Sequence, residues 1–387
     1  MLLASCHAQE PQSSIDETAI THVATPAAEY PEQYLHLLTE QRVALVVNHT
    51  SRVRDQHLVD FLRSRDVDVV KIFAPEHGYR GEADAGAELK DEELDKIPVI
   101  SLYGKKKKPS SSDLLDIDIV VFDIQDVGVR FYTYLSTLHY VMESCAESDL
   151  PVIVLDRPNP HANYMDGPVL DLKFSSFVGL HPVPIVYGMT IGEYAGMING
   201  EGWLADGLKC DLQVIACPGY LRHLEYVLPV KPSPNLPSQN SILLYPSLCL
   251  FEGTVVSVGR GTDHPFEVYG HPDIVSGSYV FTPEPTAGAS HPKLQGEQCI
   301  GRRLSATVDY TPDADRSLMM SHLFEAFREL DLRDDFFLQG LFFDKLAGTD
   351  QLRKQMLSGA SEKEIRESWV SDLDTFSQVR ERYLLYP

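Results

Sequence analysis

The residues best suited to chemistry are six acidic side chains, most of which lie just after short apolar runs. They are Glu76, Glu82, Asp84, Asp123, Asp126 and Glu252. Two carboxyl groups, one acting as an acid and one as a base or nucleophile, are the usual equipment for cleaving a glycosidic bond. His77 follows Glu76 directly, and a histidine there can orient the carboxyl group or contact a sugar. The pattern favours glycoside hydrolysis.

Signatures of other chemistries are absent from the sequence. It contains neither G-x-G-x-x-G nor G-x-x-x-x-G-K-[ST], which are typical of dinucleotide and nucleotide sites. It also lacks the G-x-S-x-G of serine hydrolases, the H-E-x-x-H of zinc proteases and any C-x-x-C pair. We therefore expect no cofactor and no metal site. Cys145 and Cys249 lie among apolar residues and are expected to be buried thiols, whereas Cys210 and Cys217 could pair in an oxidising compartment.

Alternating elements must position these residues. Five apolar runs predict strands covered on both faces: Val43–Val47, Val67–Phe73, Val99–Tyr103, Ile117–Phe122 and Val152–Leu155. Helical spacing is found at His57–Arg65 and Tyr134–Cys145, and a capping box at Thr190 begins a further helix that runs to Trp203, before a possible strand at Asp211–Ala216. This alternation predicts an α/β fold with a doubly wound, mostly parallel sheet.

The second half of the chain has a different pattern. Four prolines fall within Pro229–Pro237, which cannot be the interior of a helix or a central strand. We interpret this segment as the crossing between a domain at 31–237 and a smaller α+β domain at 238–387. The expected elements of the second domain are strands at Thr254–Val258 and Arg303–Val308 and helices at Ser317–Leu330 and Ser361–Leu385.

Polar clusters follow four of the predicted strands. They are Asn48-His49-Thr50, the segment 74–81, the segment 123–130 and the segment 156–160. In open α/β sheets, ligands bind outside the carboxyl ends of the strands. Turn preference alone explains the segment 156–160, but Glu76, His77 and Gln125 are not turn formers. The clusters therefore predict a ligand site at this edge.

Charge limits the partners. The chain carries 33 basic and 56 acidic residues, a net charge of −23, which disfavours nucleic acid and anionic membranes. The basic block Lys105–Lys108 is interpreted as a solvated loop.

The N-terminus indicates export. Leu3-Ala4-Ser5-Cys6 has the form of a bacterial lipobox, and the polar stretch Gln9–Ala28 has the composition of a tether. Only five residues precede Cys6, fewer than a secretory signal needs, so this interpretation implies further signal residues upstream. We expect a secreted or periplasmic protein that contacts the membrane only through a lipid on Cys6. Residues 1–30 are thus assigned to the lipobox and tether.

Taken together, these motifs resemble the NamZ-type exo-β-N-acetylmuramidases. The resemblance covers nearly the whole chain beyond the tether and includes Pro75-Glu76-His77-Gly78-Tyr79-Arg80-Gly81, the segment 123–134, Asp156-Arg157-Pro158-Asn159-Pro160, Gly167-Pro168, Pro182–Gly192, Pro234-Asn235-Leu236-Pro237, Phe251-Glu252-Gly253-Thr254 and Gly259-Arg260-Gly261-Thr262. It implies a Rossmann-like catalytic domain, a smaller C-terminal domain and a cleft between them. It also implies release of terminal N-acetylmuramic acid (MurNAc) from MurNAc-GlcNAc fragments of peptidoglycan.

Roles for individual residues follow from this resemblance. Glu76 matches the family's catalytic glutamate, with His77 as its neighbour and either Asp123 or Glu252 as the second carboxyl group. MurNAc differs from GlcNAc by a lactyl ether with a carboxylate, for which the candidate cations are Arg80, Arg130 and Arg260, unless each only pairs with a nearby acid. The candidate sugar contacts are Asn48, Tyr79, Tyr103, Gln125, Tyr132 and Asn235.

Two other functions fit the same residues. A sugar-binding lipoprotein would share the polar cleft but would keep its function in Glu76→Gln. A metal-dependent amidase or deacetylase would lose activity on chelation.

Overall fold

The structure is a computed structural model that describes residues 24–84, 86–87, 90–306 and 316–387. Leu3-Ala4-Ser5-Cys6 lies outside these residues. Ala27 and Ala28 are buried, and the Ala27 N–H donates to the carbonyl of Asp156 at 2.9 Å. Residues 24–30, which their composition assigned to a tether, are thus part of the fold, because small alanine side chains pack into the core.

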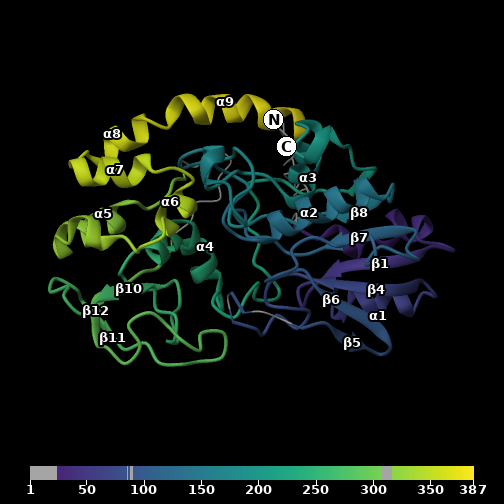
Figure 1. Cartoon of the computed structure of the whole chain (residues 1–387), viewed down its shortest axis with the longest axis horizontal. Helices are drawn as coiled ribbons and strands as arrows, with labels where there is room; N and C mark the ends of the chain where they lie inside the picture. The colour runs from purple at the N-terminus through teal and green to yellow at the C-terminus, as the bar shows by residue number, and fades with distance from the viewer. Residues whose placement is uncertain (1–23, 85, 88–89, 307–315) are drawn as a thin grey trace, which may run out of the picture.

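A seven-stranded sheet forms the N-terminal part, and most of its strands are labelled in Figure 1. Its order is β5-β6-β4-β1-β7-β8-β9, and every neighbouring pair is parallel except β5 and β6. The strand order reverses beside β1, which confirms the doubly wound α/β prediction. The strands are β1 (Arg42–Val47), β4 (Asp68–Ala74), β5 (Glu92–Leu94), β6 (Ile97–Ser101), β7 (Ile119–Asp123), β8 (Val152–Leu155) and β9 (Leu212–Ile215), with a small hairpin of β2 (Arg52–Val53) and β3 (Gln56–His57).

Both faces of this sheet are covered, as the continuous apolar runs predict. Along β1, Ala44 and Val46 join the core that includes α2 (Tyr134–Glu147) and α3 (Ile191–Gly200). The alternate residues Val43, Leu45 and Val47 join the core under α1 (Leu58–Arg63). The capping box predicted at Thr190 is present, with Glu193 as its partner.

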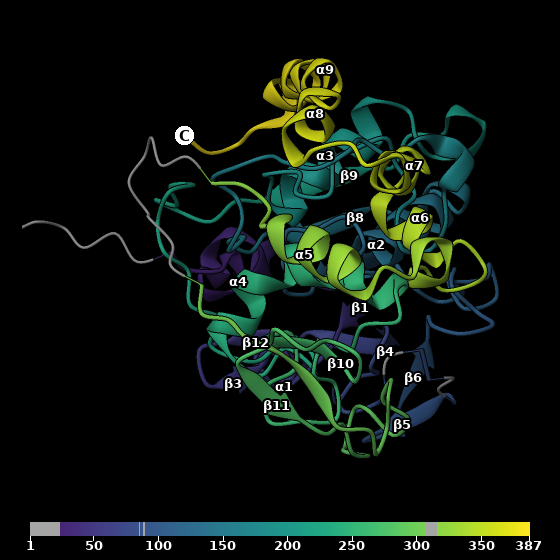
Figure 2. The same cartoon turned by 90° about the vertical axis from the view of Figure 1, so that its left-hand side faces the viewer.

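The C-terminal part is smaller and follows the proline-rich crossing, which contains no helix or strand from 229 to 237. It combines a three-stranded antiparallel sheet with helices (Figure 2). Its elements are α4 (Gln239–Leu248), β10 (Val268–His271), β11 (Tyr279–Phe281), β12 (Cys299–Arg303), α5 (Ser321–Leu330), α6 (Phe342–Ala347), α7 (Gln351–Ser358), α8 (Glu362–Glu367) and α9 (Val370–Arg380).

Three expectations for this part were wrong in detail. Thr254–Val258 is not a strand, because the ammonium of Lys293 takes the carbonyls of Thr254 and Val256 that a neighbouring strand would bind. The strand expected at Arg303–Val308 ends at Arg303, and residues 307–308 lie outside the described part. The helix expected at Ser361–Leu385 breaks after Glu367, where the hydroxyl of Ser368 bonds back to the carbonyl of Ile365.

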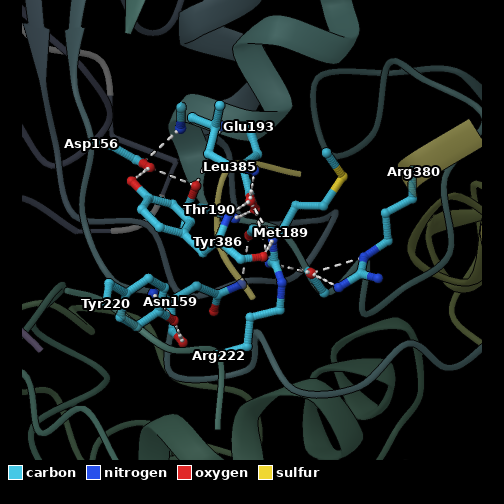
Figure 3. A network of polar contacts seen from close by, with 12 residues as sticks. Asp156, Asn159, Met189, Thr190, Glu193, Tyr220, Arg222, Arg380, Leu385 and Tyr386 are labelled. Atoms are coloured by element: carbon cyan, nitrogen blue, oxygen red, sulfur yellow. Dashed lines mark hydrogen bonds and ion pairs between the residues drawn. The ribbon is translucent and has the colours of Figure 1, made fainter. Parts of the chain in front are cut away.

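The end of the chain returns to the N-terminal part. Helix α9 runs along the top of the molecule toward α3 (Figure 1), and the tail beyond it binds Asp156 and Glu193 (Figure 3). Within the described residues, none of the helices is long and apolar enough to cross a membrane. The five cysteines there are buried free thiols, so Cys210 and Cys217 are not paired.

Candidate active site

A cavity of about 460 Å³ is lined by residues of both parts of the molecule. This volume falls in the range of small-molecule sites. The walls combine a few polar groups with many aromatic rings. The N-terminal part and the crossing supply Glu76, His77, Gly86, Tyr103, Gly104, Lys107, Phe131, Tyr132, Thr133, Phe177, Val178, Ser233, Asn235 and Leu236, and the C-terminal part supplies Tyr245, Cys249, Glu252, Arg260, Phe266, Phe342 and Leu346.

Glu76 lies in the turn that follows β4 and is 8% exposed. One of its oxygens accepts a hydrogen bond from the Gly86 N–H at 3.0 Å, and the other accepts one from the Thr133 hydroxyl at 2.6 Å. Thr133 directly precedes α2. Burial and the adjacent Glu76 carboxylate raise the pKa of Tyr103. The carboxyl group is therefore held in one orientation at the cavity wall.

The backbone of this turn is unusual. His77 has a φ of +68°, in the left-handed region, and its ring donates through Nδ1 to the Ala83 carbonyl at 2.6 Å. A side chain at Gly81 would begin 1.9 Å from the ring of His49, so this close approach requires glycine. The His49 ring in turn donates to the carbonyl of Lys231 at 2.7 Å. These contacts tie the Glu76 turn to the loop after β1 and to the crossing.

Glu252 comes from the short 3-10 turn Cys249–Gly253 that follows α4. Arg260 donates to its carboxylate at 3.0 Å, and the guanidinium lies 4.9 Å from the centre of the Phe266 ring. Lys293 fixes this turn and the residues after it. Its ammonium donates to the carbonyls of Phe251 at 2.9 Å, Thr254 at 2.5 Å and Val256 at 3.0 Å. Burial lowers the pKa of Lys293 to about 8.

Six predicted site residues do not line the cavity, among the residues that the structure describes, and three of these six are Asp123, Gln125 and Asn48. Asp123 is fully buried and paired with Arg157, with N–O distances of 2.5 and 2.8 Å. The Gln125 amide donates to the carbonyls of Asp126 and Pro158, and Asn48 donates to the Tyr134 hydroxyl. Their polar atoms hold the strand-end loops in place.

Tyr79 and Arg80 lie at a second pocket of about 200 Å³, which shares His77 with the first. The Tyr79 hydroxyl donates to the ring of His57 at 3.2 Å. Arg130 is buried and donates to the carbonyls of Pro168, Val183 and Leu346 at 2.9, 2.6 and 2.9 Å, and burial lowers its pKa to about 9. Neither the lactyl contact nor the acid partner expected for Arg130 is therefore seen. It instead holds α6, whose Leu346 lines the cavity.

Seven of the predicted residues do meet at the cavity: Glu76, His77, Tyr103, Tyr132, Asn235, Glu252 and Arg260. The Tyr132 hydroxyl donates to the carbonyl of Pro232 at 3.0 Å, and the Asn235 amide donates to that of Gly288 at 2.7 Å. Sequence reasoning missed Thr133, whose hydroxyl donates to Glu76 and makes no capping bond to the helix that follows it. It also missed the aromatic residues Phe177, Tyr245 and Phe266, whose spacing carries no signal of a site.

The interpretation of Lys105–Lys108 as a solvated loop is confirmed for Lys105 and Lys107, which are exposed, but not for Lys106 and Lys108. Lys106 pairs with Asp113 at 3.1 Å and Lys108 with Glu143 at 2.8 Å, so the loop is held against the protein. Lys107 lies between these two residues and lines the cavity. The cause is tertiary: the acids that fix the loop lie in other segments of the chain.

Comparisons with known proteins agree on one family. The models for the N-terminal and C-terminal domains of exo-β-N-acetylmuramidase NamZ match residues 43–240 and 243–386. The peptidoglycan β-N-acetylmuramidase NamZ of Bacillus subtilis (strain 168) is 38% identical, with 95% of this chain and 91% of that protein covered.

Two crystal structures of DUF1343 family proteins from Bacteroides fragilis NCTC 9343 are also similar. One is 43% identical, with a TM-score of 0.85 over 93% of this chain and 98% of that one. The other is 28% identical, with a TM-score of 0.80 over 95% of this chain and 100% of that one. The chain therefore belongs to the NamZ family of exo-β-N-acetylmuramidases, which are glycoside hydrolases.

Proposed function

We propose that this chain releases MurNAc from the non-reducing end of peptidoglycan fragments by acid–base hydrolysis in the cavity described above. The observation that carries the proposal is that two carboxyl groups, Glu76 and Glu252, line one cavity from different parts of the molecule. Family membership supports the substrate class. Two carboxyl groups around a sugar-sized space are what glycoside hydrolysis requires.

Glu76 is the proton donor. Its carboxyl group is fixed by Gly86 and Thr133 while it faces the cavity, so substrate meets an oriented acid. The proton passes to the glycosidic oxygen as the bond from that oxygen to the anomeric carbon breaks. Water then adds its hydroxyl group to the anomeric carbon, and its remaining proton passes to a carboxylate of the site, which restores the acid for the next cycle. His77, whose ring is oriented by Ala83, lies beside Glu76 and contacts the sugar.

Glu252 is the second carboxyl group. Asp123, the alternative, is fully buried in a bidentate pair with Arg157 and has no path to a substrate in the cavity. Glu252 instead shares the cavity with Glu76 and has Arg260 as its partner, which orients its carboxyl group. An ionised carboxylate stabilises the positive charge that develops on the sugar ring.

The aromatic walls supply binding to the rest of the sugar. Tyr132, Tyr245 and Phe266 lie edge to face in a chain, with ring centres 5.9 and 4.9 Å apart. The C–H faces of a sugar ring pack well on such rings, while its hydroxyls and N-acetyl group need polar partners. Asn235 and Ser233 provide these partners on the crossing.

The test is turnover of the para-nitrophenyl β-glycosides of MurNAc and GlcNAc by the wild type, Glu76→Gln and Glu252→Gln, with and without EDTA. We expect turnover of the MurNAc compound alone, unaffected by EDTA and reduced by about 10²–10⁴-fold in Glu76→Gln. Glu82→Gln is the matched control, since Glu82 lies in the same loop but at the second pocket. Full activity of a folded Glu76→Gln variant would refute the assignment.

We also propose that the protein works in the bacterial envelope, anchored by a lipid on Cys6. The lipobox-like sequence and the extracytoplasmic substrate support this location. Incorporation of labelled palmitate in a bacterial host, from a gene with a full signal sequence, tests it. Label in the wild type that is absent from Cys6→Ser is expected, and an unlabelled wild type would contradict the anchor.

A further inference from the structure

The loop 105–108 carries four consecutive lysines, and the structure separates their roles. Lys106 and Lys108 are used internally, the first by Asp113 and the second by Glu143 and Glu147, at 2.8 and 2.6 Å. The next residue, Pro109, accepts a hydrogen bond from the Ser144 hydroxyl at 2.6 Å. The loop is therefore held on both sides of Lys107, by Asp113 before it and by α2 after it.

Lys107 projects over an aromatic ring at the cavity. Its ammonium lies 4.7 Å from the centre of the Phe177 ring, and both side chains line the cavity. Phe177 is itself held in place, because its ring stacks on Tyr140 and its carbonyl accepts from the Ser136 hydroxyl at 2.7 Å. A ring face attracts a cation without neutralising it, so Lys107 keeps its charge available.

Lys107 differs from the other strong cation at the cavity because it is not paired with a carboxylate in the described part of the chain. The other strong cation in the wall, Arg260, is already neutralised by Glu252 at 3.0 Å. Among the residues that the structure describes, Lys107 has no carboxylate within ion-pair distance. The surrounding protein carries a net charge of −23, which repels anions. An anionic group entering the cavity is thus attracted to Lys107.

We propose that Lys107 binds the carboxylate of the substrate's lactyl ether and is the residue that distinguishes MurNAc from GlcNAc. This inference rests on the proposed function and names the specificity residue of the same site. GlcNAc has a hydroxyl group where MurNAc has the lactyl ether, so only MurNAc can form this charged contact. Of the three arginines expected for this role, Arg80 and Arg130 do not line the cavity and Arg260 is paired with Glu252, so Lys107 takes their place.

The first test pairs a side-chain change with a substrate change. Wild type, Lys107→Met and Lys107→Arg are assayed on para-nitrophenyl MurNAc and on its lactyl N-methylamide, which is neutral. Methionine keeps a long apolar side chain over Phe177 but removes the charge. We expect kcat/KM for the acid to fall about 10-fold in Lys107→Met, mainly through KM, and to change less than about 2-fold for the amide. Lys107→Arg should keep most of the preference for the acid.

The control for loop disruption is Lys106→Met. It removes one charge from the same block, but its side chain binds Asp113 and not the cavity. This variant should keep the wild-type ratio of acid to amide. If Lys107→Met lowered turnover of acid and amide equally, or left both unchanged, the assignment of Lys107 would be overturned.

A binding measurement separates this inference from the proposed hydrolysis. Calorimetry with free MurNAc and free GlcNAc needs no turnover. We expect the wild type to bind MurNAc more tightly than GlcNAc, and Lys107→Met to lose most of that difference. Wild-type protein that binds MurNAc selectively but cleaves nothing would refute the proposed function and leave Lys107 in place. A preference for MurNAc that persisted in Lys107→Met would refute Lys107 alone.

Discussion

Two groups of acidic residues lie in this molecule, one around Asp156 and one at the cavity, and they differ in what their oxygens meet. Asp156 is fully buried, and its oxygens accept from the Thr190 hydroxyl at 2.7 Å, the Tyr386 hydroxyl at 2.5 Å and the Gly192 N–H at 2.8 Å (Figure 3). Glu76 and Glu252 are also hydrogen-bonded, but each still faces the cavity.

The difference separates carboxylates whose oxygens bind only other parts of the protein from those that also face the cavity. Asp123 and Asp156 both sit at the carboxyl end of a parallel strand, the place where ligands bind in such sheets. Their side chains nevertheless serve the protein, since every partner in the described part is internal. A position at the end of a strand is therefore not enough to place a carboxylate in a ligand site. The side chain must also face a cavity.

The largest effect on stability is expected from Arg157→Met. This change leaves the carboxylate of Asp123 buried without its partner, and breaking a buried pair costs about 3–5 kcal/mol. Urea unfolding should show a loss of this size, while kcat per folded molecule should stay near the wild-type value. Glu76→Gln should show the reverse, with stability nearly unchanged and turnover lost. An Arg157→Met protein that stays stable but inactive would group Asp123 with the carboxylates at the cavity.

The sequence predicts the N-terminal part well because local and tertiary preferences agree there. The runs at Val43–Val47 and Val152–Leu155 are apolar throughout, which fits strands that are covered on both faces. Strand β5 was missed because Glu92–Leu94 is short and charged, and its pairing depends on β6. In the C-terminal part the long-range contact of Lys293 overrides the strand preference of Thr254–Val258.

The residues of the site also divide into those that the sequence could predict and those that it could not. Glu76 and Glu252 could be identified because a family motif surrounds each of them, and both line the cavity. The motifs around Asp123 and Gln125 are equally recognisable, but the sequence does not show whether a side chain turns inward or toward the cavity. The role of Lys107 could not be predicted for a related reason. The sequence does not show that Lys106 pairs with Asp113 and Lys108 with Glu143, and it is these pairs that hold the loop.

A smaller loss of stability is expected from Lys293→Met. This variant tests whether the lysine holds the turn that carries Glu252. The change removes the donor for several buried carbonyls around Glu252, so we expect a loss of about 2–3 kcal/mol in the free energy of unfolding. Because the turn that carries Glu252 is held by these bonds, kcat should fall as well. Lys345→Met, at an exposed position on α6, is the control and should change neither quantity. Unchanged kcat in Lys293→Met would show that the turn keeps its geometry without the lysine.

The smallest effect is expected from Tyr386→Phe, which tests whether the Asp156 network is only structural. The hydroxyl donates to Asp156 and accepts from the Cys217 N–H at 2.8 Å, so its loss should cost about 1 kcal/mol, with no change in turnover.

Burial raises the pKa of Asp156 from 3.8 to about 6, while the bond from Tyr386 lowers it. The folded protein thus binds this proton more tightly than the unfolded chain, and stability from this group is lost as the pH rises through about 6. Tyr386 offsets part of that loss because a donor stabilises the ionised form more than the neutral one, so Tyr386→Phe should cost more at pH 8 than at pH 5. Urea unfolding at both pH values measures this difference, and Tyr383→Phe, whose hydroxyl binds Glu201 in a more exposed setting, should show a smaller and pH-independent change. Equal costs at both pH values would mean that Asp156 does not titrate in this range.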